Sequence, residues 1–424
     1  MMPFKGRMFN NYICALDIGH TKIAAVVAEK KRGHLNALFC ESVPAKGLKR
    51  GSIVDSISVL GCIDRLLKNI RAKSGIGVKY IYTNVSGEDI LTKHSYAVMP
   101  LAERGNKVIG LSDISQVNEQ ARILGSSLEE EIIHEIALSY DIDSNSNVTS
   151  PLGLYSHKLG IDLYLLCARI SFLQGVTRLI NQAGCEIRGL FFSGLATSEA
   201  VFSGEDRKGI NVLCDIGGDI TEVVIFKDGL LREVRVLSCA GEDLVTALAN
   251  RLNISPELAW DIIRSHGLIG EYSQMREDRE ILVKREGAYQ PISQKLVSEI
   301  ITARANNIAS EIKECVEKIT PCSRINNFIT TGRAVLTEGF LEILENTLEV
   351  PVRLGRVKNP IISHLASRSE ELAGGRHLTY LTCLGIICKV MNRQELGSPT
   401  SSPVNRNFIS NVTSKIKAVY QEYF

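Results

Sequence analysis

Two glycine turns, one in each half of the chain, constrain the fold more than any other feature. The first is Leu-Asp-Ile-Gly-His-Thr-Lys at 16–22, and the second is Cys-Asp-Ile-Gly-Gly-Asp-Ile-Thr at 214–221. Each follows a short apolar run and continues into another, which predicts a strand, a tight turn and a second strand. Glycine lets the backbone approach an anion closely, and successive N–H groups in such a turn form an anion-binding concavity. The pair therefore predicts a phosphate-bearing ligand.

An aspartate ends the strand before each turn, at Asp17 and at Asp215. Carboxylate oxygens are ligands for Mg²⁺, which usually binds them through water because the ion keeps much of its hydration shell. One Asp-x-Gly turn alone is weak evidence, since many hairpins contain one. Two of them in matching strand contexts predict a nucleotide held in a cleft between related lobes.

Composition narrows the class of protein. A chain of 424 residues is longer than one typical core and predicts several subdomains. Hydrophobic content of 45% with 23% charged residues is ordinary for a globular protein, and a net charge of +2 gives no reason to expect nucleic acid as a partner. The 11 cysteines show no C-x-x-C spacing, which favours buried thiols in a reducing compartment over a metal site or a disulfide framework.

No segment is predicted to direct secretion or to span a membrane. Lys5 and Arg7 are not followed by the apolar core of a signal peptide. The apolar stretch at 380–390 is far shorter than the roughly 20 residues that cross a bilayer. It predicts a buried strand or helix.

Alternating strands and helices predict an α/β fold that is interrupted once. Residues 86–166 have strand–helix–strand content of their own, including a helix at 112–124 and a polar loop at 143–150. The elements expected around this insertion are strands at 12–28, 36–43, 79–85, 161–169 and 186–193 and helices at 55–72 and 171–184.

The second half repeats this alternation from Gly209. The elements expected there are two or three strands, a helix from the 240–243 turn through Leu252, a solvated hairpin or loop at 271–287, an amphipathic helix at 294–319, a strand at 327–330 and a helix after Glu338. The predicted division is 11–85 and 167–205 for the first lobe, 86–166 for the insert, 206–350 for the second lobe with an outer subdomain at 241–325, 351–392 for a return to the first lobe, 393–407 for a flexible linker and 408–424 for a terminal helix.

The terminal segment predicts an amphipathic helix. Its apolar face consists of Phe408, Ile409, Val412, Ile416, Val419, Tyr420, Tyr423 and Phe424. Such a helix can dock on the protein's own core or on a partner, or it can lie in a bilayer interface with its aromatic side chains at the headgroups. Lys415 and Lys417 would each add about 1 kcal/mol on an anionic leaflet. The residues alone leave both alternatives open.

The motifs occur in the order found in the actin/Hsp70/sugar-kinase superfamily. They are the two glycine turns, the Ala-Gly-Glu-Asp turn at 240–243 and the Thr-Gly turn at 331–332. Within the superfamily, the chain resembles the FtsA family of bacterial cell-division proteins. Segments 16–29, 151–154, 192–196 and 294–312, the position of the insert and the amphipathic tail carry this resemblance.

The resemblance implies an actin-like, two-lobed α/β ATPase fold with an FtsA-type inserted subdomain and a C-terminal amphipathic helix. It implies ATP and Mg²⁺ as ligands, with Asp17 and Asp215 near the metal and with at most slow hydrolysis. The implied nucleotide-binding residues are Asp17, Gly19, Thr21, Lys22, Asp215, Gly217, Gly218, Gly241, Glu242 and Gly332. The eight apolar residues of the tail are the implied membrane anchor.

The resemblance also implies partners. These are the FtsZ C-terminal tail through the region around 241–325, further copies of the chain in a homopolymer, later division proteins and an anionic membrane surface. No nucleic acid is expected. The implied location is the cytoplasmic face of the bacterial inner membrane at the division site.

Three residues depart from the family pattern. His20 stands where Thr or Ser is usual, Asp219 replaces a glycine, and Arg333 replaces a second glycine in the third turn. We expect Asp219 to repel phosphate unless a metal ion or Lys22 compensates. We expect Arg333 either to obstruct the cleft or to stack on adenine. No residue stands out as a base for hydrolysis and no catalytic residue is assigned, although Glu199, after the strand at 186–193, could be considered for that role.

Two other functions fit the same fold. A small-molecule kinase would need a carboxylate base that faces a substrate pocket. An actin-like adaptor of pilus assembly, similar to PilM, would lack FtsZ binding. We expect a membrane adaptor that is not primarily an enzyme.

Overall fold

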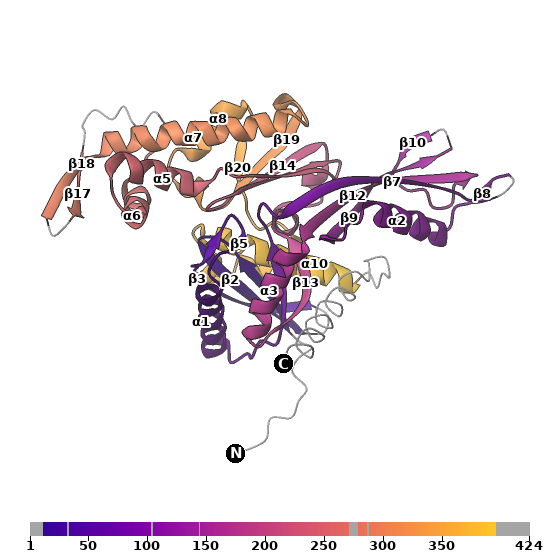
Figure 1. Ribbon diagram of the computed structural model, residues 1–424, viewed down its shortest axis with the longest axis horizontal. Coiled ribbons are helices and arrows are strands. Elements are labelled where there is room, and N and C mark those ends of the chain that lie inside the picture. The colour runs from indigo at the N-terminus through magenta and orange to yellow at the C-terminus, as the bar shows by residue number, and fades with distance from the viewer. Residues whose placement is uncertain are drawn as a thin grey trace, which may run out of the picture.

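Two α/β lobes and an inserted subdomain make up the protein (Figure 1). The computed structural model describes residues 12–395, apart from 32–33, 103–104, 144, 271–278 and 286–287. The tail helix expected at 408–424, and the linker expected at 393–407 from residue 396 onward, lie outside the described residues. The insert and the hairpin of the second lobe mark opposite ends of the long axis.

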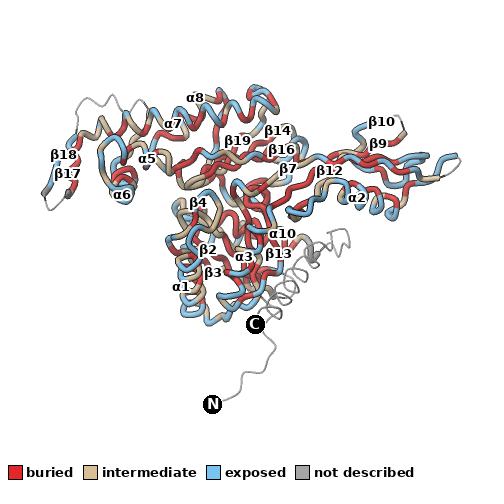
Figure 2. The backbone as a smooth tube through the Cα atoms, in the orientation of Figure 1, coloured by how far each residue is buried: buried red, intermediate tan, exposed pale blue. Residues whose placement is uncertain are grey.

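The first lobe is built on a five-stranded sheet of order β13-β6-β1-β2-β3. The neighbours β1, β2 and β3 are antiparallel, whereas β1, β6 and β13 are parallel. Every residue from 13 to 17 in β1 is buried, so both faces of the sheet are covered (Figure 2). The strands are β1 (Tyr12–Ile18), β2 (Lys22–Lys31), β3 (His34–Pro44), β6 (Tyr80–Val85) and β13 (Glu186–Phe192).

Four helices pack on this sheet: α1 (Ser56–Ser74), α3 (Ile170–Gln182), α4 (Ser193–Val201) and α10 (Leu381–Glu395). Helix α1 begins where the Asp55 carboxylate accepts hydrogen bonds from the N–H groups of Ile57 and Ser58, and it ends at the left-handed Gly75. The segment expected as a buried strand or helix at 380–390 is α10, and it packs against α4. Short elements complete the lobe: β4 (Leu48–Lys49), β5 (Ser52–Ile53) and α9 (Pro360–Ala366).

The insert has its own four-stranded sheet of order β10-β9-β12-β7. These strands are β7 (Ile90–Pro100), β9 (Glu130–Ile142), β10 (Asn145–Val148) and β12 (Lys158–Arg169), with a two-stranded ladder of β8 (Lys107–Val108) and β11 (Tyr155–Ser156) beside them. Helix α2 (Leu111–Gly125) covers the sheet with the buried Val117 and Ala121. The polar stretch expected to be only a loop contains β10, because the free edge of β9 offers it backbone partners.

The second lobe repeats the topology of the first. Its sheet has the order β16-β15-β14-β19-β20, with three antiparallel strands followed by parallel neighbours. The strands are β14 (Ile210–Ile216), β15 (Thr221–Lys227), β16 (Leu230–Leu237), β19 (Ile325–Thr331) and β20 (Val352–Leu354). The helices are α5 (Gly241–Leu252), α6 (Pro256–His266), α7 (Gln294–Glu317) and α8 (Phe340–Leu348). The matching lobes confirm the relation that the paired turns predict.

The charged stretch expected to form a hairpin or loop overlaps a two-stranded hairpin of β17 (Glu280–Arg285) and β18 (Ala288–Ser293). All eleven cysteines are buried and free, as expected for thiols in apolar cores. Within the described residues, none of the helices combines the length and the apolar character that crossing a bilayer requires.

Candidate functional site

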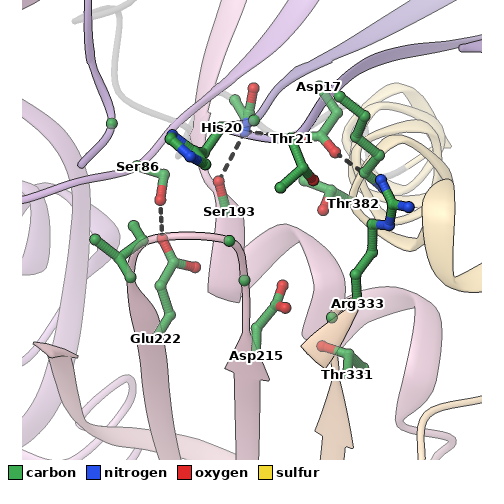
Figure 3. Close-up of a pocket in the computed structure, with 18 of the residues that line it drawn as sticks. Asp17, His20, Thr21, Ser86, Ser193, Asp215, Glu222, Thr331, Arg333 and Thr382 are labelled. Atoms are coloured by element: carbon green, nitrogen blue, oxygen red, sulfur yellow. Dashed lines mark hydrogen bonds and ion pairs between the residues drawn. The ribbon is translucent and has the colours of Figure 1, made fainter. Parts of the chain in front are cut away.

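A cleft of about 790 Å³ lies between the lobes, where the turn joining β1 to β2 faces the turn joining β14 to β15 (Figure 3). This volume includes space that is open to solvent. All the nucleotide-site residues predicted from the sequence line the cleft, except Gly241 and Glu242. Two segments of one chain that are remote in sequence therefore meet as the paired motifs predict.

The two turns have the same local geometry. In the first, the N–H of Gly19 donates to the carbonyl of Lys22 at 3.0 Å, and in the second the N–H of Gly217 donates to the carbonyl of Ile220 at 3.0 Å. A Cβ atom on Gly218 would lie 2.6 Å from the side chain of Thr21 in the facing turn. The glycines thus allow the two lobes to approach closely.

Gly241 and Glu242 lie behind the second turn, at the start of α5. Their N–H groups donate to the carbonyls of Gly217 and Gly218, at 3.2 and 2.6 Å. Both residues therefore position the second turn instead of lining the cleft. Gly332 lines it with φ +95°, and a Cβ atom there would lie 2.0 Å from the carbonyl oxygen of Ile216. No other residue type fits this close approach.

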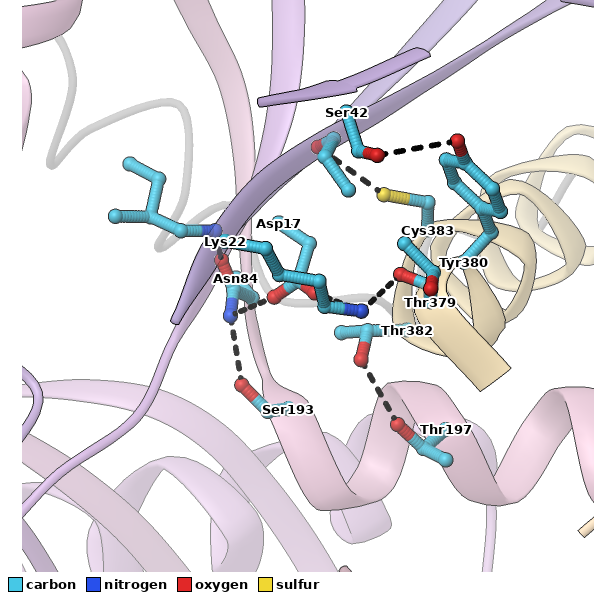
Figure 4. Close-up of polar contacts among 12 residues, drawn as sticks. Asp17, Lys22, Ser42, Asn84, Ser193, Thr197, Thr379, Tyr380, Thr382 and Cys383 are labelled. Atoms are coloured by element: carbon cyan, nitrogen blue, oxygen red, sulfur yellow. Dashed lines mark hydrogen bonds and ion pairs between the residues drawn. The ribbon is translucent and has the colours of Figure 1, made fainter. Parts of the chain in front are cut away.

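Asp17 is held at the end of β1 by groups from three segments (Figure 4). The amide of Asn84 donates to Asp17 Oδ1 at 2.7 Å and to the hydroxyl of Ser193 at 2.9 Å, and Lys22 Nζ lies 3.7 Å from Asp17 Oδ2. Burial raises the pKa of Asp17, and the Lys22 charge opposes that rise. The carboxylate is oriented and has one cationic partner.

Asp215 and Glu222 add two further buried carboxyl groups. Burial, opposed by Lys22 and reinforced by Asp17, raises the pKa of Asp215 to about 6. Burial and then the Asp215 charge raise the pKa of Glu222 to about 8. Ser86 donates a hydrogen bond to Glu222 Oε1 from the opposite lobe. Glu222 is therefore mostly protonated at neutral pH, and Asp17 and Asp215 beside Lys22 are the carboxyl groups that can attract a cation.

Sequence reasoning missed Glu222 and Asn84. The hairpin register pairs Asp215 with Glu222 across the strands, so the position of the glycine turn already indicated that both side chains share one face. Asn84 is the penultimate residue of β6, the parallel neighbour of β1. That neighbour relation is a property of the folded sheet and has no signal in the linear pattern.

The negative charge of Asp219 is balanced by other groups than the metal ion or Lys22 that we expected. Its partners are His20 Nδ1 at 2.9 Å and the backbone N–H of Arg50, both from the first lobe, and not Lys22. His20 Nε2 also lies 3.9 Å from Glu242 Oε2. Hydrogen bonds from His20 to Asp219 and Glu242 raise the pKa of His20 to about 10, so the imidazole is charged at neutral pH.

The pH dependence of stability tests this ion pair. A histidine whose pKa is raised on folding contributes stability that is complete below its ordinary pKa near 6.5 and is lost as the pH rises toward 10. We expect His20→Gln to cost about 1 kcal/mol at pH 6 and almost nothing at pH 10, measured by urea denaturation. His364→Gln on the surface of α9 is the matched control. An unchanging difference between wild type and His20→Gln would contradict the pairing.

Arg333 lines the cleft, and its guanidinium lies 5.2 Å from the ring centroid of Trp260, the single tryptophan of the chain. Burial and the nearby Arg264 lower the pKa of Arg333. The side chain thus stacks on an aromatic ring of the protein itself. Glu199 was a wrong candidate for a hydrolytic base. It lies on α4 outside the cleft and pairs with Arg207 at 3.2 Å and Lys389 at 3.7 Å.

Comparison with known proteins identifies the family. The family model described as cell division protein FtsA matches residues 212–375, and the model of the SHS2 domain inserted in FtsA matches residues 87–167. The two models together cover more than half of the chain. The chain is also 25% identical to the cell division protein FtsA of Pseudomonas aeruginosa over 369 residues, covering 83% of this chain and 87% of that protein. It is 26% identical to FtsA of Bacillus subtilis over 381 residues, covering 89% and 83%.

Solved structures share the fold. A PilM–PilN type IV pilus biogenesis complex matches with a TM-score of 0.61 and 17% identity, covering 89% of this chain and 98% of that chain. MreB 5 of Spiroplasma citri bound to AMPPNP matches with a TM-score of 0.53 and 12% identity, covering 92% and 99%. At these identities the likeness shows the fold alone.

Two lobes of one topology around a cleft between glycine turns define an actin-like protein. The family models and the relatives then specify its kind. The chain belongs to the FtsA family of cell-division proteins. The match confirms the family inferred from the motifs and favours it over a pilus-assembly adaptor.

Proposed function

We propose that this protein binds ATP with Mg²⁺ in the cleft and anchors the FtsZ ring to the membrane. The observation that carries the proposal is the cleft of this FtsA-family chain. In it, two glycine turns face each other beside Asp17, Asp215 and Glu222. The residues fit the ligand because Asp17 and Asp215 suit a hydrated cation, and turn N–H groups suit phosphate.

The proposed assignments follow from the positions of the side chains. Asp17 and Asp215 would hold Mg²⁺ through its water ligands, and Lys22 and the glycine turns would bind the phosphates. The bound ion would neutralise the carboxylates and the phosphates together. Gly332 and Arg333 would lie beside the adenosine. Glu222 is bridged to Ser86 across the cleft. The nucleotide would act as a conformational ligand that is hydrolysed slowly at most.

The proposed partners are those that the family resemblance implies. The second lobe around 241–325 would bind the FtsZ C-terminal tail, and the insert and actin-like contacts would join further copies into a polymer. Later division proteins would bind this assembly. The tail at 408–424 would hold it on the cytoplasmic face of the inner membrane at the division site. Many weak tails in one polymer would bind a membrane strongly through multivalency.

Flotation on anionic liposomes tests the adaptor function. We compare the full chain with a version ending at Asn407, each with Mg–ATP and with FtsZ that carries or lacks its C-terminal tail. We expect only the full chain to float, and only intact FtsZ to float with it. Lys415→Gln with Lys417→Gln should weaken membrane binding about thirtyfold, because the two lysines together add about 2 kcal/mol.

Two outcomes would contradict the proposal. If the full chain remains at the bottom, the tail is a docked helix and a soluble enzyme of the same fold becomes the better interpretation. If the full chain floats but intact FtsZ does not float with it, the protein is an adaptor of another membrane assembly. Phosphorylation of candidate sugars or acids by the purified protein would then identify the kinase alternative.

A further inference from the structure

His20 and Asp219 extend from the two facing turns and meet between the lobes. Their side chains form the 2.9 Å ion pair described above, and the His20 ring also contacts the second turn directly. A Cβ atom on Gly218 would lie 2.8 Å from His20 Cδ2. The two turns therefore lie close together where His20 faces Gly218.

The Asp219 carboxylate is bound in the way that a ligand anion would be. It accepts a hydrogen bond from the backbone N–H of Arg50 in the first lobe and faces the charged imidazole of His20. Its side chain is only 9% exposed. Arg50 is held in the left-handed region at φ 48°, next to Gly51, where a Cβ atom would lie 2.3 Å from the carbonyl oxygen of Ser86. The donor to Asp219 thus belongs to a tightly packed loop, which fixes its position.

Different groups lie at the two ends of the cleft. Figure 3 shows Arg333 and Thr331 on one side and His20 and Ser86 on the other, with Asp17 and Asp215 between them. A nucleoside beside Gly332 and Arg333 would extend its phosphates past the two aspartates toward His20. The phosphate farthest from the nucleoside would arrive where the ion pair already joins the lobes.

We propose that the Asp219 carboxylate takes the place of a terminal phosphate, so that the cleft prefers a nucleoside diphosphate to a triphosphate. The inference rests on the proposed nucleotide function and deepens it. A diphosphate leaves the pair between His20 and Asp219 intact. A triphosphate must separate that pair and bring its last phosphoryl group against a carboxylate, and like charges at such short range repel strongly.

Isothermal titration calorimetry with Mg–ADP and Mg–ATP tests the proposal on the full chain. We expect the wild type to bind Mg–ADP at least tenfold more tightly than Mg–ATP. Asp219→Asn keeps the shape but removes the charge, and it should strengthen Mg–ATP binding at least tenfold while changing Mg–ADP binding less than threefold. The double variant His20→Thr with Asp219→Gly should act in the same way. Glu314→Gln, on the exposed face of α7, is the control that keeps the wild-type ratio.

The possible failures are distinguishable. If the wild type binds both nucleotides equally, or if Asp219→Asn changes both affinities alike, Asp219 does not take the place of a terminal phosphate. The proposal is then wrong, and nucleotide binding stands. If neither the wild type nor either variant binds a nucleotide, the proposed nucleotide function fails and this inference fails with it.

Discussion

Replacing Lys22 with methionine should lower the free energy of unfolding by about 3 kcal/mol at pH 8, because it leaves buried carboxylates without a cation. Lys22 Nζ lies 3.7 Å from Asp17 Oδ2 and donates a hydrogen bond to the carbonyl of Thr379, which joins β2 to the chain just before α10. The Lys22 charge also opposes the rise in pKa of Asp215. Methionine keeps much of the side-chain volume, so the loss reports charge and hydrogen bonding.

The sign of the pH dependence is fixed by the same carboxyl groups. Without Lys22, their folded-state pKa values rise further above those of the unfolded chain. At low pH such a carboxyl group is protonated in both the folded and the unfolded state and does not affect stability. As the pH rises it ionises more readily in the unfolded chain than in the buried site, and the fold is destabilised. Denaturation of Lys22→Met should therefore show a larger loss at pH 8 than at pH 5.

A double-mutant cycle provides the control. Asp17→Asn combined with Lys22→Met removes both charges, and we expect it to recover more than half of the stability that Lys22→Met loses. Lys68→Met, on the exposed face of α1, should change stability by less than about 0.5 kcal/mol. A loss in Lys22→Met that Asp17→Asn does not reduce would show that the hydrogen bond to Thr379 dominates and that the ion pair contributes little.

Much of the fold could be predicted because its main signals are local. Each glycine turn lies between two apolar runs, so a β-hairpin follows from a few consecutive residues. The repeat of that pattern predicts two lobes, and the structure has two sheets of the same strand order. Helix α1 could be placed to within two residues at either end because Asp55 caps it and its apolar residues recur at helical spacing.

Only those residues of the candidate site that lie in or beside the glycine turns could be predicted from the sequence. Asp17, Lys22 and Asp215 flank glycines, and the structure places all three in the cleft. Glu199 shows the limit, because its position after a strand does not reveal which way a helix will turn its side chain. It pairs with Arg207 and Lys389 instead.

The compensation of Asp219 could not be predicted because it comes from the other lobe. Arg50 lies 169 residues away in the sequence, and its donor is a backbone N–H that has no residue signature. Only the fold brings this group to the carboxylate. Departures from a family pattern that lie far apart, here His20 and Asp219, can therefore be one interaction. Considering Asp219 alone suggested repulsion of phosphate, whereas the pair explains both substitutions.

Replacing Gly385 with alanine should lower the free energy of unfolding by about 2–3 kcal/mol, although alanine is the better helix former. A Cβ atom on Gly385 in α10 would lie 1.7 Å from the carbonyl oxygen of Ala196 in α4, so one of the two helices must move. Overpacking of this kind costs about 1–3 kcal/mol or more, and backbone cannot yield as a flexible side chain does. Helix propensity returns only about 1 kcal/mol.

The clash between α10 and α4 should also alter the cleft. Helix α4 begins at Ser193, whose hydroxyl accepts the hydrogen bond from Asn84, and Thr197 contacts Thr382 of α10 at 3.1 Å (Figure 4). Shifting α4 therefore displaces the groups that orient Asp17. Gly61→Ala is the matched control, because a Cβ atom on Gly61 in α1 would meet no other atom within 4 Å, and it should gain about 0.5–1 kcal/mol. Denaturation that leaves Gly385→Ala as stable as the wild type would show that α10 and α4 separate at little cost, and that their close approach does not hold the first lobe together.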